Sequence, residues 1–237
     1  MEQRSRNALG RWYDRSLGRI LSSERLMAVL FCVLLNGIVY WGAQTFTADW
    51  TMTDLTTALD QKIPVVPAWA IIYVAAFPFW AVGYVLMARD RQWYTIMTAE
   101  VLGKLTCGVV FFLLPTTNVR PLLGEEPFAW LLELIYAQDA ALCLLPSIHC
   151  LESWICFAGL RRRKDLPGVV RWGSFVMAVL VCISTLPTKQ HVLVDVIAGV
   201  LLAEVLVDAA RWRHWGGRLR RWFGTLDAAV FGTAGRE

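Results

Sequence analysis

Long apolar stretches follow one another along this chain, separated by short polar segments. Six of them approach the about 20 residues that a helix needs to cross the hydrocarbon core of a bilayer. They are Leu26–Ala43, Trp69–Ala88, Tyr94–Pro115, Ala140–Leu160, Val169–Pro187 and Val192–Ala210. A helix that is apolar on all sides is typical of a membrane span or a deeply buried core. The pattern therefore predicts an all-α, polytopic membrane protein with six transmembrane helices.

A seventh apolar segment, Pro127–Tyr136, is too short to cross a bilayer. It lies between Arg120 and Asp139, in the loop that follows the third predicted span. We expect a short helix that lies along the outer interface or dips into it. Such a helix can form one wall of a groove through which a lipid reaches the protein.

The basic residues are distributed unevenly, which orients the predicted spans. Of the 23 Lys and Arg residues, 19 fall in the two tails and in the second and fourth loops. The odd-numbered loops carry only Lys62, Arg120 and Lys189, beside a larger number of carboxylates. By the positive-inside rule, both termini are expected to be cytoplasmic and the sparse loops extracytoplasmic. A protein with so few basic residues elsewhere is not expected to bind nucleic acid.

Three regions follow from this arrangement: a basic amphipathic tail over residues 1–25, a six-helix membrane domain over 26–210, and a basic, Trp-rich tail over 211–237. The first tail suits either a helix on the anionic inner leaflet or a disordered segment, and both alternatives stay open. A cleaved signal peptide is the competing interpretation of the first apolar run. Its removal would leave five spans and break the alternation of loop charge. The six scattered cysteines are expected to be small apolar fillers.

Ionisable side chains inside a membrane are costly, so each is a candidate for function. His149 opens the fourth span, and His191 with Asp195 opens the sixth. Arg120 follows the third span, and Lys189 lies two residues before His191. The topology places all of these at similar depth on the outer side, although they are far apart in sequence. This convergence is the main argument for an active site.

The types and spacing of these residues are typical of phosphoryl transfer to a histidine. His191 and Asp195 are four positions apart, so on a helix they share one face. The carboxylate can hold one ring nitrogen and leave the other free to attack. His149 can protonate a leaving oxygen, and Arg120 offers a planar fork that matches phosphate. Two His and one Asp make an incomplete zinc set, so no metal is expected.

Three further sets of ionisable residues have structural or functional interpretations. Glu100 and Lys104 lie four apart within the third span and are expected to neutralise each other. Glu152 lies one turn below His149 and can orient its ring. His214 lies among arginines of the C-terminal tail, where an interfacial role is the simpler interpretation.

These residues resemble the signature of the type 2 phosphatidic acid phosphatase superfamily, the histidine lipid phosphatases and phosphotransferases. Arg120-Pro121 matches the end of the first family motif, and Pro146-Ser147-Ile148-His149 matches the second. Ser184 with His191 and Asp195 matches the third. The resemblance covers about residues 94–205. It is specific as a set, whereas each motif alone is weak.

The resemblance implies a role for each matched residue. His191 would be the nucleophile, Asp195 its orienting partner and His149 the general acid. The phosphate ligands would be Arg120, Ser147 and Ser184. The family is metal-independent, so the resemblance implies no cofactor.

The chain departs from the family pattern at two positions. Leu113 stands where a lysine is expected, and Thr185 where an arginine is expected. Lys189 can supply one missing charge, as in the branch that resembles inositol phosphorylceramide synthases and related bacterial membrane proteins. The departures leave hydrolysis and transfer to an alcohol as alternatives.

The sequence thus predicts a bacterial inner-membrane enzyme that hydrolyses a lipid phosphomonoester or pyrophosphate at the extracytoplasmic face. Its partners would be the lipid phosphate substrate and the surrounding membrane lipids. The nearest alternative is a lipid head-group phosphotransferase. A non-enzymatic lipid transporter is a third possibility, but Asp195 beside His191 argues against it, because anion binding gains nothing from a buried carboxylate.

Overall fold

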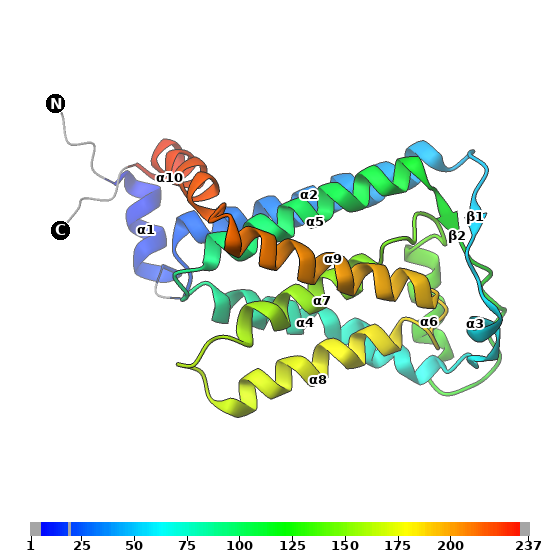
Figure 1. Ribbon diagram of the computed structural model, residues 1–237. Coiled ribbons are helices and arrows are strands. Elements are labelled where there is room, and N and C mark those ends of the chain that lie inside the picture. Colours follow the sequence, from blue (N-terminus) through cyan, green and yellow to red (C-terminus); the bar gives the residue numbers. More distant parts are fainter. Residues whose placement is uncertain (1–5, 19, 233–237) are drawn as a thin grey trace.

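Six long helices form the body of the protein in a computed structural model that describes residues 6–18 and 20–232 (Figure 1). Each lies at one of the six predicted apolar runs. They are α2 (Ser23–Thr47), α4 (Ala70–Met87), α5 (Trp93–Leu113), α7 (Ile148–Leu160), α8 (Gly168–Ser184) and α9 (Leu193–Trp212). The all-helical class is therefore confirmed.

Three helical stretches within the described residues are long and apolar enough to cross a membrane. These are α2, the stretch Pro67–Met87 and α5. Helices α7 and α8 are apolar but shorter, with 13 and 17 residues. Six crossings, and the side on which the termini lie, remain predictions.

The fourth predicted span is shorter than its apolar run, because α7 begins at Ile148 rather than near Ala140. Pro146, after a cis peptide bond, has no N–H to donate to a helical ladder. Ser147 then acts as the N-cap, and its hydroxyl accepts a hydrogen bond from the backbone N–H of Cys150 at 3.3 Å. The sequence Pro-Ser thus ends the loop and starts the helix.

The remaining elements gather at the two ends of the bundle (Figure 1). At one end, β1 (Thr53–Asp54) pairs in parallel with β2 (Thr116–Thr117). The same end carries α3 (Ala58–Lys62), the 3₁₀ helix η1 (Pro67–Trp69) and α6 (Ala129–Gln138). Helix α6 confirms the short helix predicted from Pro127–Tyr136. At the opposite end lie α1 (Ala8–Ser16) and α10 (Gly216–Phe231).

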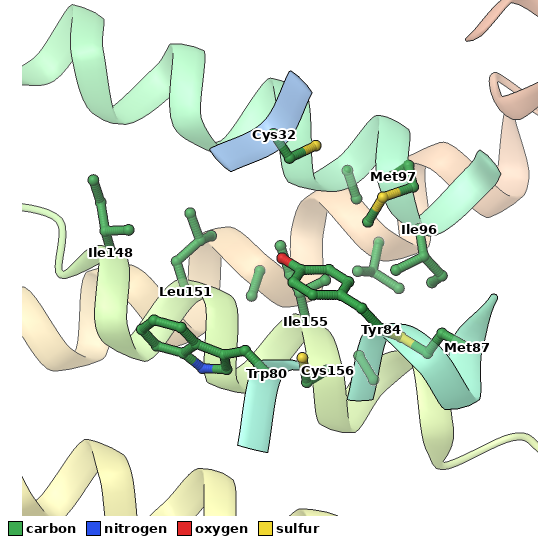
Figure 2. Packing of buried hydrophobic residues seen from close by; sticks show 14 of the residues in the cluster. Cys32, Trp80, Tyr84, Met87, Ile96, Met97, Ile148, Leu151, Ile155 and Cys156 are labelled. Carbon is green, nitrogen blue, oxygen red and sulfur yellow. The ribbon is translucent and has the colours of Figure 1, made fainter. Parts of the chain in front are cut away.

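Helix α7 lies at the centre of the apolar core (Figure 2). Its residues Leu151, Ile155 and Cys156 are fully buried. They belong to one cluster with Tyr84 of α4 and Ile96 of α5. All six cysteines are free and buried, as expected for small apolar fillers.

Both tails contribute a helix that packs on the bundle. Phe223 of α10 is buried, with its ring centroid 5.8 Å from that of Phe31 and 6.5 Å from that of Tyr94. Helix α1 forms within the basic N-terminal tail, which agrees with the helical alternative for that segment. Residues 1–5, 19 and 233–237 of the predicted tails lie outside the described residues.

A buried ionic group links α5 to α7. The ammonium of Lys104 lies 2.9 Å from a carboxylate oxygen of Glu100 and 2.5 Å from one of Glu152. The predicted Glu100–Lys104 pair is therefore present. Glu152 joins that pair, which makes its predicted role as the partner of His149 wrong.

Candidate active site

His191 and Asp195 form a local pair at the start of α9. The Nδ1 atom of His191 lies 3.3 Å from Oδ2 of Asp195, and the same oxygen accepts a hydrogen bond from the backbone N–H of Val192 at 3.0 Å. Asp195 is fully buried. Because Nδ1 is engaged by the carboxylate, Nε2 is the ring nitrogen left for chemistry.

A tight turn between α8 and α9 holds His191 in place. The carbonyl of Thr185 accepts hydrogen bonds from the backbone N–H groups of Gln190, at 3.0 Å, and His191, at 3.1 Å. Lys189 completes the turn with a φ of 52°, a left-handed conformation that is uncommon for residues other than glycine. The turn fixes the backbone of His191 before the helix begins.

His149 reaches the same place from the start of α7. The backbone N–H of Ser147 donates to the carbonyl of Asp195 at 3.1 Å, which joins the beginnings of α7 and α9. This approach requires Gly199, because a Cβ atom there would lie 2.6 Å from the carbonyl oxygen of Ser147. The ring centroids of His149 and His191 are consequently only 6.4 Å apart.

Tyr73 of α4 contacts His149 directly, and this contact was not predicted from the sequence. The two rings stack with centroids 4.3 Å apart. The Tyr73 hydroxyl lies 3.4 Å from Nδ1 of His149. The Nε2 atom of His149 is buried and has no hydrogen-bond partner among the described residues. A hydroxyl inside an otherwise apolar run was the only available signal.

Arg120 is held beside the His191 turn. Its Nη2 atom donates to Oε1 of Gln190 at 2.9 Å, and its Nη1 atom donates to the carbonyl of Asp139. The guanidinium lies 4.9 Å from the centre of the Tyr136 ring in α6. Arg120 is thus held beside the His191 turn through Nη1 and Nη2. Its Nε atom is buried and has no hydrogen-bond partner among the described residues.

The three remaining predicted phosphate ligands are also engaged. The Lys189 ammonium donates to the carbonyls of Asp60, at 2.9 Å, and Ile63, at 2.6 Å. It therefore ties the α3 segment to the turn. The Ser184 hydroxyl is fully buried and donates to the carbonyl of Val181 at 2.7 Å. Ser147 caps α7, as described above.

His191 and His149 line two separate cavities, one more polar and one mostly apolar. His191 lines a cavity of about 620 Å³ at the β1–β2 end of the bundle, together with Lys189, Asn118 and Asp60. His149 lines a second cavity, of about 540 Å³, whose walls are mostly apolar side chains of α2, α4 and α6. We call the first the polar cavity and the second the apolar groove. The short helix α6 is one wall of the groove, as predicted.

Burial and nearby charges shift the pKa values of His191 and Lys189 in opposite directions. Burial alone would lower the pKa of His191, but the hydrogen bond to Asp195 and its negative charge raise it above the usual value. Burial lowers the pKa of Lys189, and the nearby charge of Asp60 only partly opposes this. His191 therefore binds a proton more readily than an ordinary histidine.

Within the described residues, no three His, Cys, Asp or Glu side chains gather into a group that could hold a metal ion. The histidines instead occur as a facing pair, each with its own orienting partner.

Comparison with known families agrees with this arrangement. The profile of the PAP2 superfamily matches residues 49–210, which include α4 to α9 and both histidines. The chain belongs to this superfamily, whose members are phosphatases or phosphotransferases. No curated protein and no solved structure matches the chain. The apolar helices and the family together are consistent with a membrane protein.

Proposed function

We propose that the protein cleaves the phosphoester bond of a lipid phosphate through a covalent phosphohistidine on His191. The observation that carries this proposal is the pair of neighbouring histidines, 6.4 Å apart between ring centres, of which His191 lines the polar cavity and His149 lines the apolar groove. A substrate with an apolar tail and a phosphate head needs both environments at one place.

The first step uses both rings. Nε2 of His191 attacks the phosphorus, a nitrogen–phosphorus bond forms, and the bond from phosphorus to the lipid oxygen breaks. His149 gives a proton to that oxygen, so the lipid leaves as an alcohol. Asp195 balances the charge that develops on His191.

The apolar groove suits the tail of the lipid. Its walls carry Phe77, Leu131 and Leu134, which are apolar, and His149 lies among them. Phe77 and Leu134 are also more than half exposed, so this region faces the bilayer in a membrane-embedded chain. A lipid in the groove would place its ester oxygen beside the general acid.

In the second step water, or an alcohol in its place, attacks the phosphohistidine and releases His191. We propose water as the acceptor, which makes the protein a phosphatase. The phosphotransferase alternative is kept because the polar cavity of about 620 Å³ is much larger than one water molecule requires. The open side of this cavity faces the extracytoplasmic space in the orientation that the loop charges predict.

Radioactive phosphate transfer tests the nucleophile. Purified protein in detergent, given a lipid phosphate labelled at phosphorus in the presence of a chelator, should form an acid-labile, base-stable phosphoprotein. His191→Ala should abolish this label. His149→Ala should still form it from an aryl phosphate, whose leaving group needs little protonation. Equal labelling of the wild type and His191→Ala would contradict the proposal, and His214→Ala is the matched control.

Oxygen-18 water separates hydrolysis from transfer. Hydrolysis should place one heavy oxygen in each released phosphate. If free phosphate is not formed while a new phosphodiester lipid accumulates on addition of diacylglycerol, ceramide or a polyol, the phosphotransferase alternative is correct.

A further inference from the structure

A third cavity, of about 210 Å³, lies at the opposite end of the bundle from the histidines. Helix α7 connects the two ends of the bundle: His149 lies in its first turn, and Gly159, in its last turn, lines this cavity. The cavity is enclosed by the end of α4, the start of α5, the ends of α7 and α9, and the loop that follows α7. It shares no lining residue with the polar cavity or the apolar groove. We call it the basic cavity, because Arg162, Arg163 and Arg211 line it.

One of the three arginines is already matched by carboxylates. Arg163 donates to both oxygens of Asp165, at 2.7 and 2.5 Å, and lies 3.3 Å from Asp90. Its remaining Nη1 atom donates to the carbonyl of Leu86 at 2.8 Å. Asp90 and Asp165 are also the only carboxylates among the described lining residues. The acidic side chains of the cavity are therefore committed to Arg163.

Three other nitrogens of the lining residues lack hydrogen-bond partners among the described residues. Arg211 donates through Nη2 to the carbonyl of Ala158 at 2.7 Å, but its Nε and Nη1 atoms are buried and unbonded among the described residues. The Nε1 atom of Trp93 is also buried and without a hydrogen-bond partner among the described residues, and Trp93 is only 1% exposed. Buried N–H groups almost always have a hydrogen-bond acceptor, and these three nitrogens belong to two residues that line one cavity, which points to an acceptor there.

The positive charge of the lining residues indicates that the acceptor is an anion. Arg162 and Arg211 add two positive charges that the lining carboxylates do not balance. Asp208 lies 3.8 Å from Arg162 and 3.7 Å from Arg211, beyond hydrogen-bond distance, and its side chain is 59% exposed. A guanidinium with two free N–H groups and an indole N–H fit the tetrahedral oxygens of a phosphate group.

We propose that the basic cavity is a second phosphate-binding site, separate from the catalytic histidines. Its occupant is a phosphate group, carried by the head of an anionic phospholipid or present as free inorganic phosphate. The cavity lies at the end of the bundle that carries most of the basic residues, where anionic lipid heads gather in the predicted orientation. A phosphate there would join α5, α7 and α9 through Trp93, the loop after α7 and Arg211.

Thermal unfolding measures this binding. The six buried cysteines become reactive only when the chain unfolds, so a thiol-reactive dye can follow the transition of the protein in detergent. The titrants are inorganic phosphate, dioctanoylphosphatidylglycerol, and dioctanoylglycerol as the lipid without phosphate. A ligand of the folded state raises Tm in a saturable way. Because phosphate also fits the catalytic site, the difference between variants reports on the basic cavity.

Trp93→Phe keeps an aromatic ring and removes one N–H, so the apparent Kd should rise about fivefold, as for one lost hydrogen bond. Arg211→Lys keeps the positive charge but removes the planar guanidinium with its paired N–H donors, so the Kd should rise about tenfold. Arg218→Gln, an exposed arginine of α10, should leave the Kd unchanged. Stabilisation by phosphatidylglycerol alone identifies a lipid head as the occupant, and stabilisation by both anions identifies phosphate itself.

Three results would overturn the proposal: no rise in Tm with either anion, wild-type Kd values in both Trp93→Phe and Arg211→Lys, or an equal loss in Arg218→Gln. The last result would mean that surface charge alone attracts the anion. Trp93→Phe remains informative if Arg211→Lys fails to fold, because its ring can still pack edge-on against Tyr84, as the indole does at 6.3 Å.

Discussion

Tyr73 stacks on His149 with ring centroids 4.3 Å apart, and its hydroxyl lies 3.4 Å from the Nδ1 atom of that histidine. The contact parallels the one between His191 and Asp195, because Nδ1 is the engaged ring nitrogen in both pairs. In the proposed mechanism, Nε2 is then left for the substrate. The two histidines differ in the charge of the partner. A carboxylate favours protonation of His191, whereas a neutral phenol adds no charge beside His149.

Tyr73→Phe should therefore impair proton donation without affecting attack. We expect kcat to fall about tenfold for an alkyl phosphate, whose leaving oxygen needs a proton, and to change less than about twofold for an aryl phosphate. The KM of both substrates should stay near the wild-type value. Tyr84→Phe, a buried tyrosine of the same helix, is the control. An equal loss with both substrates would show that Tyr73 only supports packing.

Asp195→Asn should change the pH dependence of the reaction. In the proposed mechanism His191 attacks in its neutral form, so kcat/KM should rise with pH through the pKa of this residue. Asp195 raises that pKa against the effect of burial, and its neutral replacement should lower it. The acid limb should move to lower pH while the plateau falls, by as much as about 10⁴-fold, because the tautomer is no longer fixed. An acid limb that stays in place would mean that another group controls it.

The length of the apolar runs predicted the positions of the six long helices, since a bilayer demands long apolar segments with internally satisfied backbones. The start of α7 differed from the start of the predicted span, because Pro146 and Ser147 set the beginning of the helix locally. The length of an apolar run does not detect such local signals. The i,i+4 spacing also predicted the contact between His191 and Asp195, which is a local contact.

Contacts between distant segments were harder to predict. The distribution of charge among the loops predicted that His149 and His191 lie at the same end of the bundle, and their rings are close to each other. The stacking of Tyr73 on a residue 76 positions away left no pattern in the sequence. Lys189 was expected to face a phosphate, but its ammonium binds two carbonyls of the α3 segment. The direction of a flexible side chain depends on its neighbours in space, which spacing does not reveal.

Lys104→Met should destabilise the folded protein. The Lys104 ammonium pairs with Glu100 and Glu152, and all three residues are buried. Removal of the one cation leaves two carboxylates in an apolar interior, which costs about 3–5 kcal/mol in comparable cases. The melting temperature in detergent should fall clearly, whereas Lys164→Met at an exposed position should have little effect.

A compensated variant tests the cause of that loss. If unpaired charge is responsible, Glu100→Gln and Glu152→Gln introduced together with Lys104→Met should recover most of the stability. Failure to recover would point to packing around the lysine stem instead.

The orientation of the chain in the membrane can be tested with single cysteines at the two ends of the bundle. Leu122 is fully exposed at the histidine end, and Lys164 is exposed in the loop next to the basic cavity. Because all six native cysteines are buried, an impermeant thiol reagent should label the wild type weakly. On intact cells, Leu122→Cys should be labelled and Lys164→Cys should be labelled only after the membrane is opened. This expectation rests on the 19 basic residues of the tails and even-numbered loops, which resist translocation across the membrane. Labelling of Lys164→Cys alone on intact cells would place the histidines on the cytoplasmic side, and the lipid phosphate would then have to come from the inner leaflet.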